Sequence, residues 1–147
     1  MGENLQFIAN RAEKKGSAFY LSASQARLNN SVFNNNSAMQ AATMIIESDS
    51  LFDCFSCTFQ GNYADDSSVL FAQNNEGTSS LFRDTRFIKN TAGTNLINLL
   101  YSNVSFTNCI FQDNLAEAVN HGITLISSES YIVNATINYT TTANNSA

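Results

Sequence analysis

The chain has 147 residues, of which 44% are hydrophobic and only 13% are charged, and its formal net charge is -5 at pH 7. Its seven basic residues are dispersed along the sequence, which argues against nucleic-acid binding, because that function needs a basic patch or stripe. No apolar run reaches the roughly 18 residues of a membrane-spanning helix, so the sequence predicts no membrane span.

One pattern, Phe-x-x-Asn-x-Ala, recurs five times along the chain. Its Phe residues are separated by 26, 26, 28 and 24 residues, and a sixth, eroded copy places Ile137, Thr140 and Thr142 at the corresponding positions. A fixed period of this length is the signature of a repeat architecture. We expect the recurring residues to form structural ladders, made of Phe7, Phe33, Phe59, Phe87 and Phe111 and of Asn10, Asn36, Asn62, Asn90 and Asn114.

The segment before each Phe has the alternation of a strand with one face on a core. Positions two and five before the Phe are small or apolar, whereas the position directly before it is mixed. The position three before it is always Asn, Ser or Asp, whose side chains bond their own backbone in turns. We therefore expect bends at Asn4, Asn30, Ser56, Asp84, Asn108 and Asn134.

A dense apolar run follows each Ala after a polar spacer, at residues 18–21, 44–46, 69–72, 96–100 and 123–126. Near-continuous apolar runs are typical of parallel strands covered on both faces. Each run ends in polar residues that we expect to form a turn. The longest insertion, Asn74-Asn75-Glu76-Gly77, falls at such a corner and explains the 28-residue spacing.

A unit of 26 residues with two or three short strands and no helical periodicity cannot bury its apolar face alone. We therefore predict an all-β fold, a right-handed parallel β-helix (β-solenoid) of roughly five to six rungs, in which equivalent strands stack. A propeller or a sandwich is the alternative, but the Asn-Gly and Asp-Gly dipeptides typical of hairpins are absent. Residues 1–139 are predicted to form a single continuous array, and residues 140–147 a polar tail or the start of further sequence.

The repeat resembles the Phe-x-x-Asn repeats of surface-exposed β-helix proteins of the pectin-lyase-like class. The nearest likeness is to the chlamydial polymorphic membrane proteins, which are autotransported adhesins whose repeats pair Phe-x-x-Asn with a Gly-Gly-Ala-Ile element. Phe7-Ile8-Ala9-Asn10-Arg11-Ala12, followed by Gly16-Ser17-Ala18-Phe19-Tyr20, comes closest to both halves, while later units keep only the placement of the second element. The resemblance implies a fold and a surface location, and it transfers no binding site.

The three cysteines do not suit a structural zinc site, which needs four ligands. Cys57 and Cys109 share a column but lie two rungs apart, about 9.6 Å at the strand spacing, beyond the reach of a disulfide. We expect inward-facing thiols that act as small core residues. The alternative is a disulfide between Cys54 and Cys57 within one rung.

Six Asn-x-Ser/Thr triplets without Pro are candidate N-glycosylation sites. Structural and functional interpretations both stay open for them, because a chain in which Asn, Ser and Thr make up 51 residues generates some triplets by chance. Glycosylation would make the protein secreted and eukaryotic. The candidates are Asn29, Asn35, Asn103, Asn134, Asn138 and Asn144.

An enzymatic function is the alternative that the pectin-lyase-like resemblance raises, since that class includes polysaccharide lyases and hydrolases. Asp65-Asp66, Arg86 with Lys89, and His121-Gly122 echo elements of polygalacturonases, but in those enzymes the His-Gly element precedes the basic one. No pair of carboxylates recurs on one strand column, as acid-base catalysis or a Ca²⁺ site would need. We expect no catalytic residue, no cofactor and no metal.

The sequence thus predicts a non-catalytic structural or interaction module of an extracellular or cell-surface protein, such as a stalk, a filament subunit or an adhesin-like β-helix. Unpaired strand edges at the two ends would favour end-to-end self-association with other copies. Glycans are the other expected partners. A carbohydrate-active β-helix that acts through the spacers around Asp65, Asp66 and His121 is the alternative.

Overall fold

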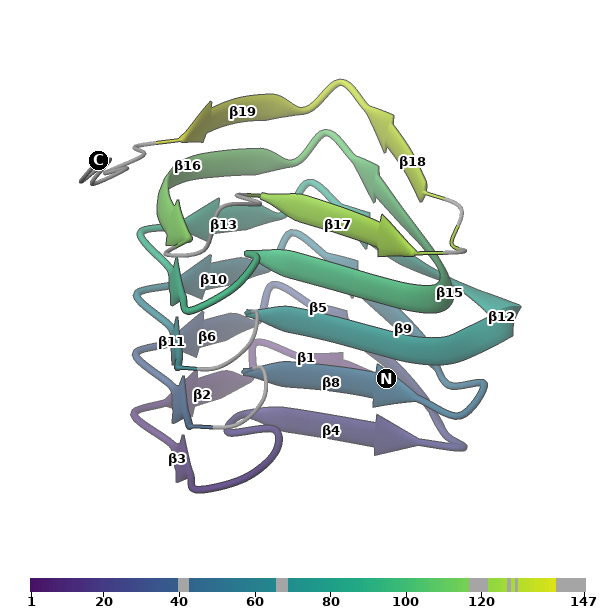
Figure 1. Ribbon diagram of the computed structural model, residues 1–147, viewed down its shortest axis with the longest axis horizontal. Coiled ribbons are helices and arrows are strands. Elements are labelled where there is room, and N and C mark those ends of the chain that lie inside the picture. Colours follow the sequence, from purple (N-terminus) through teal and green to yellow (C-terminus); the bar gives the residue numbers. More distant parts are fainter. Residues whose placement is uncertain (40–42, 66–68, 117–121, 127, 129, 140–147) are drawn as a thin grey trace, which may run out of the picture.

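The computed structural model describes residues 1–39, 43–65, 69–116, 122–126, 128 and 130–139. This part of the chain contains strands and no helix, and it coils into a parallel β-solenoid of about five turns (Figure 1). Equivalent strands are roughly 26 residues apart and pair in parallel with the turn before and the turn after. The structure confirms the predicted parallel solenoid.

Each turn passes through four columns of stacked strands. The first column holds the apolar runs: β4 (Phe19–Ser22), β8 (Met44–Glu47), the beginnings of β12 (Leu70–Arg83) and β15 (Ile97–Thr107), and β17 (Ile123–Ile126). The second column holds β1 (Gly2–Glu3), β5 (Gln25–Asn29), β9 (Leu51–Phe55), the ends of β12 and β15, and β18 (Ser130–Val133).

The third column carries the recurring Phe, and the fourth column carries the recurring Ala. The third is made of β2 (Gln6–Ile8), β6 (Val32–Asn34), β10 (Thr58–Gln60), β13 (Arg86–Ile88), the beginning of β16 (Ile110–Ala116) and β19 (Thr136–Tyr139). The fourth is made of β3 (Arg11–Ala12), β7 (Ser37–Ala38), β11 (Tyr63–Ala64), β14 (Thr91–Ala92) and the end of β16.

Left-handed backbone conformations turn the chain at three corners. The first corner joins the first and second columns, the second corner joins the second and third, and the third corner joins the third and fourth. All six bends predicted three residues before the Phe have a positive φ, between 47° and 55°, so the second corner confirms that prediction. The corresponding residues of the third corner are Ala9, Asn35, Gly61, Lys89 and Asp113.

Two rows of aromatic rings fill the core. The third-column rings of Phe7, Phe33, Phe59, Phe87 and Phe111 stack nearly parallel, with neighbouring centroids 4.4–4.9 Å apart. A second row consists of Phe19 from the first column and Phe52, Phe82 and Phe106 from the second, with neighbouring centroids 5.3–5.6 Å apart. Phe19, Phe82 and Phe106 also contact the rings of the first row. Buried aromatic pairs of this kind add about 0.5–1.5 kcal/mol each beyond the burial of their area.

The insertion predicted at residues 74–77 lies at the first corner, slightly later than expected. Asn75 pairs with Ser102 and Ser79 pairs with Asn103, so the register shifts and residues 76–78 are extra in β12. A bulge of this kind lets one strand carry additional residues while the pairing resumes on both sides. It accounts for the single spacing of 28 residues.

The last described rung is less covered than the rungs below it. Ile132 and Ile137 occupy the inward positions that Phe106 and Phe111 hold one rung earlier. The two isoleucines are 41% and 45% exposed, whereas the two phenylalanines are fully buried. Thr140 and Thr142 of the eroded copy, like the predicted tail 140–147, lie outside the described residues.

Candidate functional site

The recurring Asn residues form a continuous hydrogen-bonded ladder inside the third corner. Asn62 receives two hydrogen bonds at Oδ1, from the backbone N–H and the side-chain Nδ2 of Asn36, both at 3.0 Å. Its own N–H and Nδ2 donate to Oδ1 of Asn90 at 3.0 and 2.9 Å, and Nδ2 also donates to the Phe33 carbonyl at 2.9 Å. Asn36, Asn62, Asn90 and Asn114 are at most 1% exposed.

This ladder leaves the amides of Asn36, Asn62 and Asn90 no capacity for an outside ligand. One amide oxygen can accept two hydrogen bonds and one NH₂ group can donate two, and Asn62 uses all of them within the solenoid. A buried polar group without a partner would cost about 1–3 kcal/mol. The Asn pattern, which looks like a recognition motif in the sequence, therefore has a structural role.

A second polar ladder lies in the first corner, and sequence reasoning missed it. Ser50 Oγ donates to the Glu47 carbonyl at 2.6 Å and accepts from the Ser24 N–H at 3.1 Å, while the Ser50 N–H donates to Asn75 Oδ1 at 2.8 Å. The pattern could have been found from serines that recur 26 residues apart, but Asn75 and the bulge interrupt it. The full ladder is Ser24, Ser50, Asn75, Ser102 and Ser128.

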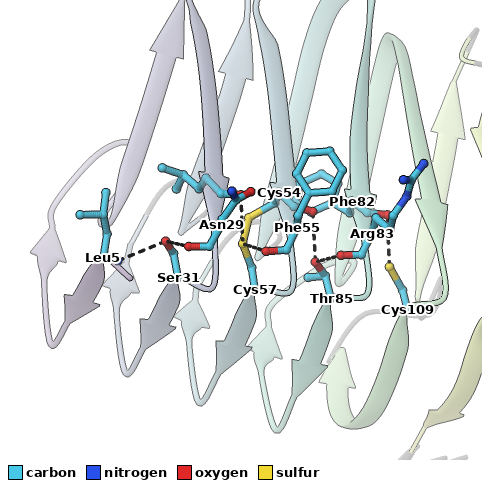
Figure 2. The surroundings of a disulfide bond; sticks show 11 residues. Leu5, Asn29, Ser31, Cys54, Phe55, Cys57, Phe82, Arg83, Thr85 and Cys109 are labelled. Carbon is cyan, nitrogen blue, oxygen red and sulfur yellow. Dashed lines mark hydrogen bonds between the residues drawn. A yellow bond between two sulfur atoms is a disulfide. The ribbon is translucent and has the colours of Figure 1, made fainter. Parts of the chain in front are cut away.

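Hydroxyl and thiol donors close the second corner from inside. Ser31 Oγ donates to the Asn29 carbonyl at 2.9 Å, and Thr85 Oγ1 donates to the Arg83 carbonyl at 3.0 Å (Figure 2). Cys109 Sγ lies 3.5 Å from the Thr107 carbonyl in the same arrangement. The sequence showed this column as small and inward. The structure adds that Ser31, Thr85 and Cys109 cap the carbonyl two residues earlier, on the far side of the bend.

Cys54 and Cys57 form a disulfide within this corner, so the expectation of free thiols for this pair was wrong (Figure 2). Ser56 between them has a φ of 54°, and this bend turns both side chains inward with a Cα–Cα distance of 6.0 Å, which lies within the range for a disulfide. Because a disulfide sulfur carries no proton, the 3.6 Å contact from Cys57 Sγ to the Phe55 carbonyl is not a hydrogen bond.

Cys109 is the free, buried cysteine of the described chain. Burial raises the pKa of its thiol, and backbone hydrogen bonds at Thr85 and Thr107, which act in the opposite direction, do not offset that effect. The thiolate is the reactive form of cysteine. Cys109 is therefore a small core residue, as the sequence predicted for inward-facing thiols.

Five of the six sequon asparagines lie in the described part of the chain. They occupy the second column (Asn29 and Asn103), the second corner (Asn134), the third column (Asn138) and the third corner (Asn35). Three of them are exposed, and Asn29 and Asn103 are half-buried. Asn103 Nδ2 donates to the Glu76 carbonyl of the bulge at 3.2 Å. Asn144 lies outside the described residues.

The described residues among those weighed for catalysis, Asp65, Arg86 and Lys89, do not interact with one another as a site. Asp65, at the end of the fourth column, is exposed and accepts a hydrogen bond from the Tyr63 hydroxyl at 2.9 Å. Arg86 is exposed on β13, and Lys89 occupies a bend of the third corner. Among the described residues, neither a hydrogen bond nor an ion pair links Asp65 to either of these cations. Asp66 and His121 lie outside the described residues.

The outward side of the second column carries residues that do not recur from rung to rung. Arg27 binds Asp53 through Nε and Nη2 at 3.1 and 2.7 Å, and the Asp53 side chain is 10% exposed. The Phe55 ring lies between two guanidinium groups, with Cζ of Arg27 at 6.0 Å and Cζ of Arg83 at 5.6 Å from its centroid. These distances are within the range of cation–π attraction.

A scan against protein-family models, a search of curated proteins and a search of solved structures each find no match to this chain. The chain's own residues therefore carry the functional argument. Within the described ranges, no helix has the length and hydropathy of a membrane span. The same residues include no group of three or more His, Cys, Asp or Glu side chains placed to hold a metal ion.

Proposed function

We propose that the chain is a non-catalytic structural and interaction module, a rigid β-solenoid segment of an extracellular or cell-surface protein. The observation that carries this proposal is the closed Asn ladder: the residues that recur most strictly are buried and bonded to one another. The repeat thus builds a scaffold. Contacts with partners are left to the outward residues, which differ from rung to rung.

The proposed location rests on two further features. Disulfides such as Cys54–Cys57 persist in oxidising compartments and are rare in the cytosol. The five described sequon asparagines all lie outside the core, where glycans could be carried. Subcellular fractionation of the native protein, with mass spectrometry before and after an N-glycosidase, tests this part. A cytosolic protein without glycans would contradict it.

The scaffold role is tested separately, by the activity and the rigidity of the purified chain. We expect no depolymerisation of a panel of neutral and acidic polysaccharides, and we expect backbone amides of the central rungs to be protected from hydrogen exchange. A depolymerising activity that Asp66→Ala abolishes would favour the carbohydrate-active alternative and overturn the scaffold role.

Self-association through the end rungs belongs to the same proposal. β17, β18 and β19 each pair with a neighbour on one side only among the described strands, and Ile132 and Ile137 leave apolar surface there. Unpaired edges of this kind favour pairing with another chain. Sedimentation velocity over a hundredfold concentration range is expected to show growing assemblies, and a concentration-independent monomer would contradict this step.

A further inference from the structure

The second column presents an outward patch in which two Arg side chains lie around one aromatic ring. It consists of Arg27 on β5, Leu51 and Phe55 on β9, and Leu81 and Arg83 on β12, which we call the arginine patch. Asp53 lies within it, at 7% exposure, as the partner of Arg27. Aromatic and Arg side chains are the residue types that dominate protein-binding hot spots.

The register of the strands fixes how this patch is arranged. Phe55 pairs with Arg83 in the next rung and with Asn29 in the rung before, and Asp53 is flanked in the same way by Leu81 and Arg27. Arg27 and Arg83 are therefore two rungs apart, about 9.6 Å along the solenoid axis at the usual strand spacing. The Phe55 ring lies between them, and Figure 2 shows the Phe55 and Arg83 side chains projecting to the same side.

The two arginines differ in their ion pairing. The Nε and Nη2 groups of Arg27 are engaged by Asp53, yet its side chain remains 54% exposed. Arg83 is exposed and, within the described residues, forms no ion pair. Both guanidinium groups retain donors, in a fork geometry that matches carboxylates. A hollow of about 340 Å³ beside Arg27, lined in part by Leu51 and Asp53, adds depth to the patch.

We propose that the arginine patch binds an acidic peptide segment of a partner protein, with carboxylates on Arg27 and Arg83 and apolar side chains against Leu51, Phe55 and Leu81. The combination of two cations with an apolar centre favours a segment that alternates acidic and apolar residues. A purely anionic ligand such as a sulfated polysaccharide would leave the apolar centre unused. This inference rests on the proposed interaction module and names its partner class.

The test is an NMR titration of the ¹⁵N-labelled chain with the peptide acetyl-Glu-Leu-Glu-Leu-Glu-amide. The chain is produced without N-glycans, because the sequon residue Asn29 neighbours Phe55. We expect amide shifts confined to β5, β9 and the end of β12, and a loss of binding as salt is raised from 20 to about 300 mM, where charges are screened. The peptide in which Gln replaces each Glu is expected to cause no shifts.

Arg83→Gln is expected to weaken binding by about fivefold to tenfold, whereas Arg11→Gln, at an exposed arginine of the fourth column, is expected to leave it unchanged. Arg27 is not the residue to change, because its loss would leave Asp53 almost buried without its partner. Phe55→Leu, which keeps apolar bulk but removes the ring, provides a second variant and is expected to weaken binding about twofold to fivefold.

Three results would overturn the proposal: no shifts with the acidic peptide at millimolar concentration, equal shifts with inorganic sulfate alone, or equal affinity in Arg83→Gln. Each leaves the scaffold role intact, because that role is judged by rigidity and by the absence of polysaccharide cleavage. Failure of the peptide test is therefore distinguishable from failure of the proposed function.

Discussion

The first and third corners of this solenoid satisfy their buried backbone groups with different side chains. The third corner repeats a single residue, Asn, whose amide bonds the next rung and a Phe carbonyl of the previous one. The first corner uses Ser in four rungs and Asn75 in one, with each serine oxygen capping a local carbonyl. The third corner keeps one left-handed residue directly before each Asn from Asn10 to Asn114, and its register shifts only where β16 meets β19, between Gln112 and Asn114. The first corner contains the bulge of three residues, 76–78, within the array.

The difference shows that some corners of a repeat fold hold neighbouring rungs in register, whereas others accept changes in length. An amide with two donors and an acceptor couples neighbouring rungs directly. A substitution at the third corner therefore removes hydrogen bonds to two other rungs. A hydroxyl mainly closes its own bend, so the first corner tolerates an insertion. We infer that the third corner sets the register of the solenoid and that variation is admitted at the first.

Asn62→Ala is the change with the largest expected effect on this comparison. It would remove the acceptor of the Asn36 N–H, one of the two acceptors of Asn36 Nδ2, and the side-chain donor to the Phe33 carbonyl, at about 1–3 kcal/mol for each buried group. We expect the free energy of unfolding, measured by urea denaturation, to fall by about 3–6 kcal/mol. Asn34→Ala, on the outward side of β6, is the control, and a loss below about 1 kcal/mol for Asn62→Ala would contradict the ladder's role.

Ser50→Ala probes the equivalent position of the first corner. The change removes one hydrogen bond to the Glu47 carbonyl and one acceptor for the Ser24 N–H. Because that N–H is at a partly solvated bend, we expect a smaller loss, about 1–2 kcal/mol by urea denaturation. The exposed neighbour Ser48 supplies the control variant Ser48→Ala, and a loss as large as that of Asn62→Ala would erase the distinction between the corners.

Deletion of residues 76–78 tests whether the first corner accommodates length changes. Asn75 and Ser79 would then follow the pairing of Ser102 and Asn103 without a register shift. Relative to the preceding rung, the corner would change from two residues longer to one residue shorter. The deletion removes the side-chain hydrogen bonds from Thr78 Oγ1 to the Ser50 carbonyl at 2.8 Å and from Asn103 Nδ2 to the Glu76 carbonyl at 3.2 Å. We therefore expect the free energy of unfolding to change by no more than about 2 kcal/mol. Deletion of residues 61–63 at the third corner is the matched control and is expected to prevent folding.

Tyr101→Asn is expected to stabilise the chain slightly. Tyr101 has a φ of 50° at the first corner and is 46% exposed, and the left-handed region costs most residues about 1–2 kcal/mol but suits Asn better. Thermal unfolding should therefore shift upward, by the equivalent of about 0.5–1 kcal/mol. The control Tyr131→Asn removes an exposed ring from β18, and a downward shift in Tyr101→Asn alone would mean that the ring makes a stabilising contact.

The fold could be predicted from sequence because its determinants repeat. Phe, Asn and the bend residues recur at one period, so their columns and the direction of their side chains were visible without coordinates. The Cys54–Cys57 disulfide was left as the alternative, because only the left-handed turn at Ser56 brings the two Cα atoms to 6.0 Å. The first-corner ladder was missed because Asn75 replaces the serine in one rung and lies one residue off the 26-residue spacing of the others.

The candidate binding surface could not be predicted, for the opposite reason. The arginine patch is built from residues that occur once each, in three different rungs, and only the register brings Arg27, Phe55 and Arg83 together. A repeated pattern in the sequence identifies the residues that have the same structural role in every rung. It does not identify binding residues that occur in a single rung.

Hydrogen exchange of the side-chain amides tests the central claim most directly, because the claim is that the recurring Asn residues are internal scaffolding. NMR can follow the Nδ2 protons of Asn36, Asn62 and Asn90, with those of the exposed Asn108 as the reference. We predict exchange of the three buried amides only through opening of the solenoid, at least about a thousandfold slower than at Asn108. Exchange of the buried amides at the rate of Asn108 would contradict the account.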